Sequence, residues 1–368
     1  MVLFRQIILA STICVFGVFL ATSESFLGLA NCGRTRLILF TATYSICFGI
    51  CNGQGYTIPL RLCWDLFPNN KGMVTGIITC GFGIGSFLFG IVSTLLINPH
   101  NLKMETIGND HIYGLDVANN TMYALRKLAI YWAIFTVVAL ILIKIDPKPE
   151  QNSDHSTKET IENTESEPEL TMLDLIKDRR YWLLYVMNFC TFFYGYTLIG
   201  SYKVFGGMYI HDDLFLTYVG SIGCVFGSLR FFWSMMLDFG FTFPQVYGTL
   251  CIVQLICASL IFQATKDGYK YGFMALMAIS MFCEGGHFVL LPSHCAQVFG
   301  SSKRGVKAFS YLFSSFGICS LSGGLLSAKL QEMTSDPFKH IIQISQLLTI
   351  IALCTLSYYN KVLSDQQT

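Results

Sequence analysis

Three ionisable side chains stand inside apolar stretches of this sequence. Glu284 and His287 lie in CEGGHFVLLP, residues 283–292, and Arg230 lies in GSLRFFWSMMLD, residues 227–238. A carboxylate or an imidazole can hold a proton, and a planar guanidinium can grip a carboxylate through two parallel hydrogen bonds. These residue types predict the handling of a small anion or of protons. The alternative for Glu284 and His287, one helical turn apart, is a packing role in which they satisfy each other or a neighbouring helix. The alternative for Arg230 is an arginine that reaches the membrane edge.

Composition indicates what surrounds those side chains. Hydrophobic residues make up 53% of the 368 and charged residues only 13%, about half the share in a soluble domain. Apolar stretches of about 20 residues, which is enough to cross a hydrocarbon layer about 30 Å thick, recur along the chain. We therefore predict an all-α, polytopic integral membrane protein in contact with a lipid bilayer. Ionisable groups inside such a protein nearly always face the bundle interior or a water-filled cavity.

Ten spans are predicted, and the first has an alternative interpretation. One early cation, an apolar core and small residues after it make residues 1–25 resemble a signal peptide as well. The predicted spans cover residues 6–22, 36–59, 73–97, 124–145, 181–205, 214–236, 243–264, 271–292, 306–327 and 338–358.

A polar segment divides the ten spans into four and six. Residues 146–170 are rich in Glu, Ser, Thr and Asn, and contain one large aliphatic residue, Ile161, before the final leucine. Such a segment cannot bury enough apolar surface to fold. We predict an N-terminal half-bundle over 1–146, a cytoplasmic linker over 147–178 and a C-terminal half-bundle over 179–368. A modest excess of Lys and Arg on the linker side supports its cytoplasmic placement.

The motifs of most other protein classes are missing from the sequence. The fourteen cysteines are scattered, without the Cys and His spacings of a metal site. The glycines at 81, 83, 85 and 90 follow no predicted strand, so close helix packing is a better interpretation than a dinucleotide fingerprint. We therefore expect no enzyme, no cofactor, no metal and no nucleic-acid partner.

Two blocks of the sequence align without a gap across the linker. CNGQGYTIPLRLCWDLFPNNKG, residues 51–72, aligns with EGGHFVLLPSHCAQVFGSSKRG, residues 284–305. Each block predicts an apolar helix that ends at proline, then a short turn, a basic residue with glycine, and a new helix. Two copies in the same direction indicate parallel repeats about an axis along the membrane normal. The matched pairs are Pro59 with Pro292, Gly72 with Gly305, Gln54 with His287 and Cys51 with Glu284.

The alignment also predicts a deficit in the first half. Three spans precede the helix of Pro292, whereas only one precedes the helix of Pro59. The first half therefore lacks two spans, so that the chain is either a ten-helix derivative or an incomplete piece of a longer protein.

Longer stretches carry a family resemblance. GQGYTIPLRLCWDLFPNNKGMVTGIITCGFGIGSFLFGIVSTLLINP, residues 53–99, resembles the fourth and fifth helices of the oxalate/formate antiporter branch of the major facilitator superfamily, close to the monocarboxylate transporters. Residues 202–238 are similar to the family's seventh and eighth helices, and residues 283–292 resemble its protist members. The spacing from Trp64 to Phe67 departs from the family pattern. The resemblance implies a major facilitator-type helical bundle without its first two helices.

The resemblance implies transport of small organic anions by alternating access. Arg230 matches the eighth-helix cation that holds a substrate carboxylate in the family. The eleventh helix has no mid-helix lysine here, so Lys203 is the nearest substitute, with an interfacial anchor as its alternative. A single assigned cation favours a monocarboxylate such as formate, lactate or pyruvate over oxalate. Transport would proceed by antiport or symport, with protons as a candidate coupling ion. The predicted substrate-binding residues are Arg230, Lys203, Gln54, Tyr56, His287 and Glu284.

A second predicted set controls conformation. Asp238 corresponds to the loop after the eighth helix, where an acidic residue in this superfamily helps to latch one closed state against a helix N-terminus or an arginine. Its alternative is an ordinary solvated aspartate. The predicted gating residues are Asp238, Pro59, Gly72, Pro292 and Gly305. Two other functions stay open: a transport-dead relative that acts as a membrane receptor or scaffold, and a carrier for another small solute.

Overall fold

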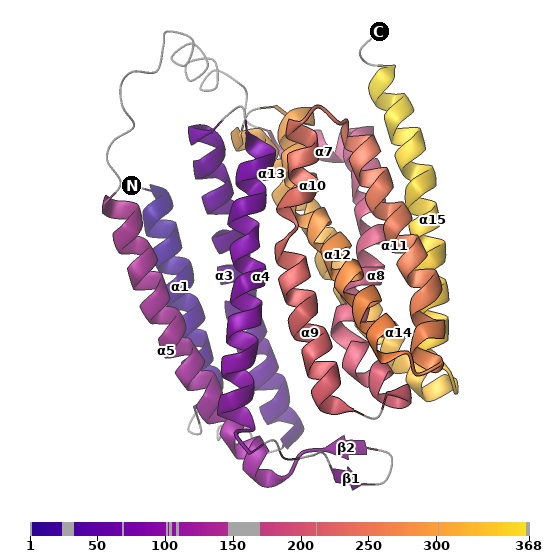
Figure 1. Ribbon diagram of the computed structural model, residues 1–368. Coiled ribbons are helices and arrows are strands. Elements are labelled where there is room, and N and C mark those ends of the chain that lie inside the picture. The colour runs from indigo at the N-terminus through magenta and orange to yellow at the C-terminus, as the bar shows by residue number, and fades with distance from the viewer. Residues whose placement is uncertain are drawn as a thin grey trace. The chain divides into compact units, whose positions relative to one another are not determined.

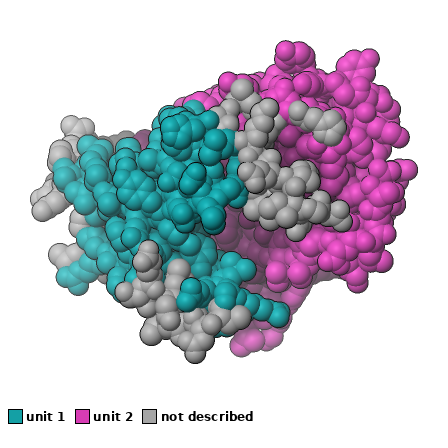
Figure 2. Space-filling model, turned by 90° about the horizontal axis from the view of Figure 1, so that it is seen from below, with its two compact units in different colours: residues 1–59, 88–167 teal, residues 60–87, 168–368 magenta. Residues whose placement is uncertain are grey.

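Long apolar helices make up most of the described residues (Figure 1). The computed structural model describes residues 2–23, 33–67, 70–100, 102, 105–107, 110–145, 170–210, 212–300 and 302–365. They belong to two units, which Figure 2 distinguishes by colour. Unit 1 comprises Met1–Pro59 and Leu88–Glu167, and unit 2 comprises Leu60–Phe87 and Pro168–Thr368. The boundary passes through two helices, so the predicted division at 1–146, 147–178 and 179–368 stays a prediction.

Unit 1 holds apolar helices and one small hairpin. Alanines allow α1 and α5 to pack closely, with Ala10, Ala124 and Ala129 all buried. Arg126 of α5 donates hydrogen bonds to the hydroxyl and the carbonyl oxygen of Thr22 at the end of α1. The elements are α1 (Val2–Ala21), α3 (Gly33–Leu66), α4 (Lys71–Ile97), the antiparallel strands β1 (Glu105–Ile107) and β2 (Asp110–Ile112), and α5 (Leu115–Ile145), with parts of α3 and α4 assigned to unit 2.

Unit 2 is a helical bundle around α12. Sequence signals fix several helix starts: Thr242 and Gln245 form a capping box before α11, and Pro337 occupies the first turn of α15. Gly240 and Gly268 turn the chain with positive φ at the ends of α10 and α11. The helices are α7 (Met172–Lys177), α8 (Arg179–Tyr209), α9 (Asp213–Ser228), α10 (Phe231–Asp238), α11 (Phe243–Lys266), α12 (Lys270–Val298), α13 (Ser302–Leu312), α14 (Ser314–Met333) and α15 (Pro337–Ser364).

Within the described residues, nine helical segments are long and apolar enough to cross a membrane, and α1 is a further apolar helix. The share of each segment that is buried differs widely. In α8 and α12, 61% and 67% of the most apolar window is buried, against 6% in α3, α4 and α5. Since α12 also packs against α8, α9, α11 and α13, it is the central helix of unit 2. The apolar side chains exposed on α3, α4 and α5 suit contact with lipid.

Four details differ from the sequence-based predictions. The predicted span at 214–236 breaks between α9 and α10, and the span at 306–327 breaks at Phe313 between α13 and α14. Pro59 and Pro292 lie inside α3 and α12, so the prediction that each proline ends a helix is wrong. Membrane helices tolerate proline because neighbouring groups satisfy the carbonyl that it leaves free. Residues 147–169 of the predicted linker lie outside the described residues, and the end of the linker contains α7.

Candidate functional site

Arg230 lies at the break between α9 and α10 and is 7% exposed. Its Nε donates a hydrogen bond to the carbonyl oxygen of Gly227 at 2.7 Å, and its guanidinium carbon lies 5.5 Å from the centroid of the Phe288 ring. Gly285 of α12 provides room for it: a Cβ there would lie 2.9 Å from Arg230 Cβ and 3.1 Å from Nε. The arginine is therefore packed against the central helix and does not reach the end of a span.

Glu284 is buried in the middle of α12, with 3% of its surface exposed. Its carboxylate lies against Gly195 of α8, where a Cβ would fall 1.7 Å from Oε2. Within the described part of the chain, neither carboxylate oxygen has a hydrogen-bond partner. The alternative in which Glu284 and His287 satisfy each other therefore does not describe this arrangement.

His287 is fully buried and is bonded to α11. Its Nδ1 lies 3.1 Å from the hydroxyl of Tyr247, and its Nε2 lies 3.2 Å from Oε1 of Gln254. The Gln254 amide nitrogen donates to the carbonyl oxygen of Thr191, which fixes its oxygen as the acceptor for the imidazole. In a neutral ring Nε2 then carries the proton and Nδ1 accepts from Tyr247. This network matches the helix-packing alternative for His287.

Sequence reasoning missed the partners of this network. Tyr247 and Thr191 lie 2.7 Å apart through their hydroxyl oxygens, and Gln254 also donates to Thr349 at 3.3 Å. Gln254 could have been predicted as a site residue, because its polar side chain interrupts the apolar run CIVQLICASLIF, residues 251–262. Phe288, which lies beside Arg230, had no sequence feature that marked it other than its position next to His287.

The structure brings two predicted gating residues together. The backbone N–H of Met73, in the first turn of α4, donates to Oδ2 of Asp238 at 2.7 Å. A Cβ at Gly72 would lie 2.7 Å from the backbone oxygen of Ser234 and 2.9 Å from Asp238 Oδ1. The acidic residue thus meets a helix N-terminus, where its charge is favoured. Any part in gating stays a prediction.

The other two gating residues of unit 2 lie at the end of α12 and the start of α13. Gly305 lets the two helices approach, because a Cβ there would lie 2.4 Å from Ala296 Cα. Pro292 is buried within α12.

The remaining predicted site residues are dispersed. Lys203 lies half-buried in α8, beyond Gly195 along the helix. Gln54 and Tyr56 belong to α3 in unit 1, as does Pro59. The side-chain oxygen of Gln54 is buried without a hydrogen-bond partner among the described residues. Their participation in one substrate site with Arg230 stays a prediction.

Glycines of the 81–90 run differ in their surroundings. A Cβ at Gly83 would lie 2.3 Å from the hydroxyl of Ser228, whereas Gly81, Gly85 and Gly90 face open space. The expectation of close helix packing therefore fits only Gly83.

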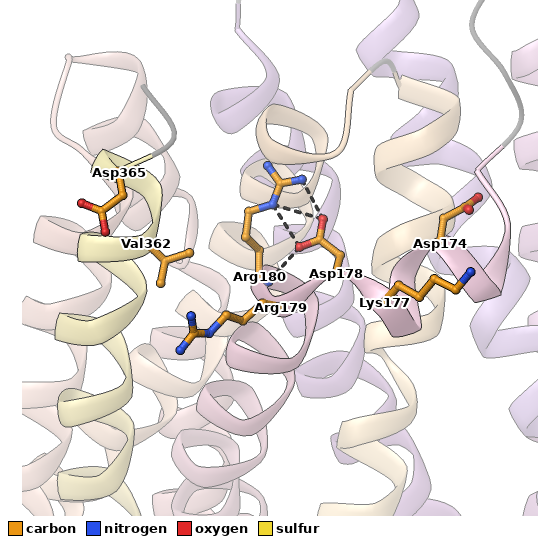
Figure 3. A pocket seen from close by; sticks show the side chains of 7 residues that line it. All are labelled: Asp174, Lys177, Asp178, Arg179, Arg180, Val362 and Asp365. Atoms are coloured by element: carbon orange, nitrogen blue, oxygen red, sulfur yellow. Dashed lines mark hydrogen bonds and ion pairs between the residues drawn. The ribbon is translucent and has the colours of Figure 1, made fainter. Parts of the chain in front are cut away.

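An open pocket of about 530 Å³ lies where α7 ends, α8 begins and α15 ends (Figure 3). Arg180 and Asp178 form an ion pair at 2.6 Å inside it, and Arg179 lies over the ring of Tyr358. Three cations and three carboxylates line the pocket, so its charges balance and do not favour a free anion. The lining residues are Asp174, Lys177, Asp178, Arg179, Arg180, Val362 and Asp365. Within the described ranges, no group of three His, Cys, Asp or Glu residues suits a metal.

An ion pair links the turn between α8 and α9 to the start of α12. Lys270 donates to Oδ2 of Asp212 at 2.9 Å, and the carboxylate also accepts from the backbone N–H of Phe215 at 3.0 Å. These two interactions, the lysine first, lower the pKa of Asp212.

Comparison with known proteins agrees with this architecture. The chain is 22% identical over 356 residues to apicoplast pyruvate carrier 1 of Toxoplasma gondii, covering 86% of this chain and 62% of that protein. It is 22% identical to the oxalate:formate antiporter of Oxalobacter formigenes, covering 85% of this chain and 67% of that protein. The chain is 23% identical to a protein of Escherichia coli (strain K12) named "Uncharacterized MFS-type transporter YhjX", covering 78% of this chain and 64% of that protein. The chain thus spans about two thirds of the length of these relatives.

Solved structures show the same fold. The transporter FucP in an outward conformation matches with a TM-score of 0.63 and 12% identity, covering 97% of this chain and 83% of the other. A bacterial homologue of the iron transporter ferroportin, in an outward-facing state, matches with a TM-score of 0.53 and 13% identity, covering 98% and 84%. The predicted all-α membrane bundle is thereby confirmed. A family model described as "Major Facilitator Superfamily" matches residues 4–323. The chain is an integral, multi-pass membrane protein, and it belongs to the Major Facilitator Superfamily.

Proposed function

We propose that this protein moves small monocarboxylates, such as formate, lactate or pyruvate, across a membrane by alternating access, with oxalate as a further candidate. The observation that carries the proposal is the buried Arg230 at the break between two helices. Relatives named as a pyruvate carrier and an oxalate:formate antiporter support the same class of substrate.

The surroundings of Arg230 suit a carboxylate. The bond from Nε to Gly227 orients the guanidinium plane, and the Phe288 ring forms an apolar wall beside it. A guanidinium keeps its charge when buried and binds a carboxylate through two parallel hydrogen bonds. A helix break exposes backbone groups at the same depth, which membrane proteins tolerate where the backbone lines a cavity or is buried in protein.

The number of buried cations favours a substrate with one carboxylate group over a substrate with two. Arg230 is the cation buried against α12, and Lys203 is the candidate for a second contact, from its half-buried position in α8. Gln54 and Tyr56 of α3, together with His287 and Glu284 of α12, complete the proposed polar lining. The proposed gating contacts are those of Asp238, Gly72, Gly305, Pro59 and Pro292.

Uptake into liposomes tests the proposal. We would reconstitute the purified chain and measure the entry of labelled formate, lactate, pyruvate and oxalate. Arg230→Ala should lower uptake about 100-fold, since a charged hydrogen-bond partner contributes about 3 kcal/mol. Arg230→Lys keeps the charge but loses the two parallel hydrogen bonds of the guanidinium, so uptake should fall by a smaller factor. Lys329→Ala, at an exposed lysine of α14, is the control and should transport normally.

Three outcomes would point elsewhere. Equal uptake by the wild type and by Arg230→Ala would remove Arg230 from the site. Absence of flux for all four anions, with a sugar or another neutral solute transported, would favour a carrier for another cargo. Absence of any flux in a folded protein would favour the receptor or scaffold alternative.

A further inference from the structure

The buried carboxyl group of Glu284 has no role in packing that accounts for it. It lies in the middle of the central helix α12 with 3% of its surface exposed. Neither oxygen has a hydrogen-bond partner among the residues that the structure describes. Buried polar groups are nearly always hydrogen-bonded, so an orphan carboxyl group needs an explanation.

Neighbouring polar groups are already committed elsewhere. His287, one turn further along α12, uses both ring nitrogens for Tyr247 and Gln254. The hydroxyl of Tyr194 on α8 pairs with Ser280 at 2.8 Å. The space next to the carboxyl group is created by Gly195, where any side chain would collide with it.

The titratable and charged groups that act on Glu284 come from several helices. They are Tyr194 of α8, Tyr247 of α11, Cys283 of α12, Cys319 of α14 and Arg230 at the break before α10. Of these, Arg230 alone carries a permanent charge, and its Nε is bonded to Gly227. An ionised carboxylate in this position would have lost its hydration without gaining a hydrogen bond.

We propose that Glu284 is a proton-binding site, occupied in this conformation and emptied when α8 and α12 move apart. On release the O–H bond of the carboxyl group breaks, the proton passes to water, and the carboxylate keeps the electron pair. Proton binding at Glu284 does not require a bound substrate. Its coupling to transport rests on the proposed function: an anion at Arg230 repels an ionised Glu284, so the anion and the proton bind more tightly together than apart.

Infrared spectroscopy of the whole protein tests proton binding without any substrate. Protein labelled with ¹³C at the glutamate side-chain carboxyl separates glutamate bands from aspartate bands. At pH 7 the wild type should show the C=O stretch of a protonated glutamate, and Glu284→Gln should lack it. Glu332→Gln, at an exposed acid at the end of α14, should keep it. Absence of the band from the wild type, or its persistence in Glu284→Gln, would overturn the proposal.

A pair of glycine variants gives a second test that keeps the glutamate. Gly195→Ala places a Cβ 1.7 Å from Oε2, so the carboxyl group must move and its band should shift. Gly200→Ala on the same helix meets nothing within 4 Å and should leave the band in place. Equal spectra for both variants would show that the band belongs to another carboxyl group.

Liposome transport then tests the coupling. With one proton for each anion, a gradient of one pH unit should drive about tenfold accumulation in the wild type. In Glu284→Gln the ratio of anion inside to anion outside should no longer depend on the imposed pH gradient, whatever the rate at which the variant exchanges anions. Gradient-driven accumulation that persists in Glu284→Gln would refute coupling through this residue. If the wild type carries none of the four anions yet shows the infrared band, the proposed function fails and the proton site stands.

Discussion

The backbone N–H of Met73 donates a hydrogen bond to the carboxylate of Asp238 at 2.7 Å, although 165 residues separate the two in sequence. The bond caps the first turn of α4 with a negative charge, which complements the unpaired N–H groups and the dipole of a helix N-terminus. The contact ties α4 to the end of α10 within unit 2.

Asp238→Ala should remove this cap. We expect the free energy of unfolding to fall by a few tenths to about 1 kcal/mol, because a helix N–H loses its acceptor at an exposed position. Unfolding in mixed detergent micelles measures the loss. Glu332→Ala, at an exposed acid on α14, is the control, and an equal loss in both variants would contradict a specific role for the Met73 contact.

Gly76→Ala should destabilise the protein, whereas Gly81→Ala on the same helix should not. A Cβ at Gly76 would lie 2.6 Å from Cα of Phe231, and Gly81 faces open space. Overpacking of this kind costs about 1 to 3 kcal/mol, while alanine in an open helical position adds about 0.5 to 1 kcal/mol of stability. Thermal unfolding of the two variants in one detergent compares them, and the reverse order would show that α4 and α10 pack differently.

Tyr247→Phe should destabilise unit 2 through His287. The change removes a hydroxyl group that lies 3.1 Å from Nδ1 and 2.7 Å from Thr191, so buried polar groups lose a partner. Such a loss costs about 1 to 3 kcal/mol. Tyr196→Phe, at an exposed tyrosine of α8, is the matched control and should leave unfolding unchanged. A neutral result for Tyr247→Phe would mean that its hydroxyl group does not support the histidine.

Asp212 should contribute to stability only where its carboxyl group is ionised. Its pKa is lowered in the folded state by Lys270 and by the N–H of Phe215, so the contribution is present above the ordinary aspartate pKa. The contribution is lost as the pH falls through the folded-state value. Asp212→Asn should therefore be less stable than the wild type near pH 7, with the difference vanishing at low pH. Added salt should reduce the difference, because the pair is exposed.

Several features of this protein are determined by sequence alone. Apolar runs long enough to span a bilayer predict the helices, because only internally hydrogen-bonded segments are stable in lipid. Arg230, Glu284 and His287 were identifiable because ionisable residues are rare in such runs. The motifs over residues 53–99 and 202–238 indicated the superfamily.

Other features depend on contacts between distant segments, which local pattern does not encode. The prolines looked like helix ends, but α3 and α12 continue past Pro59 and Pro292, as membrane helices tolerate. The spacing along α12 suggested a hydrogen bond between Glu284 and His287. In the structure the imidazole is hydrogen-bonded to α11 instead, and the carboxyl group lies beside Gly195. The sequence thus determined which residues are polar within the membrane. Their partners were decided by tertiary structure, because a hydrogen bond requires a donor and an acceptor atom from different helices to lie within about 3 Å of each other.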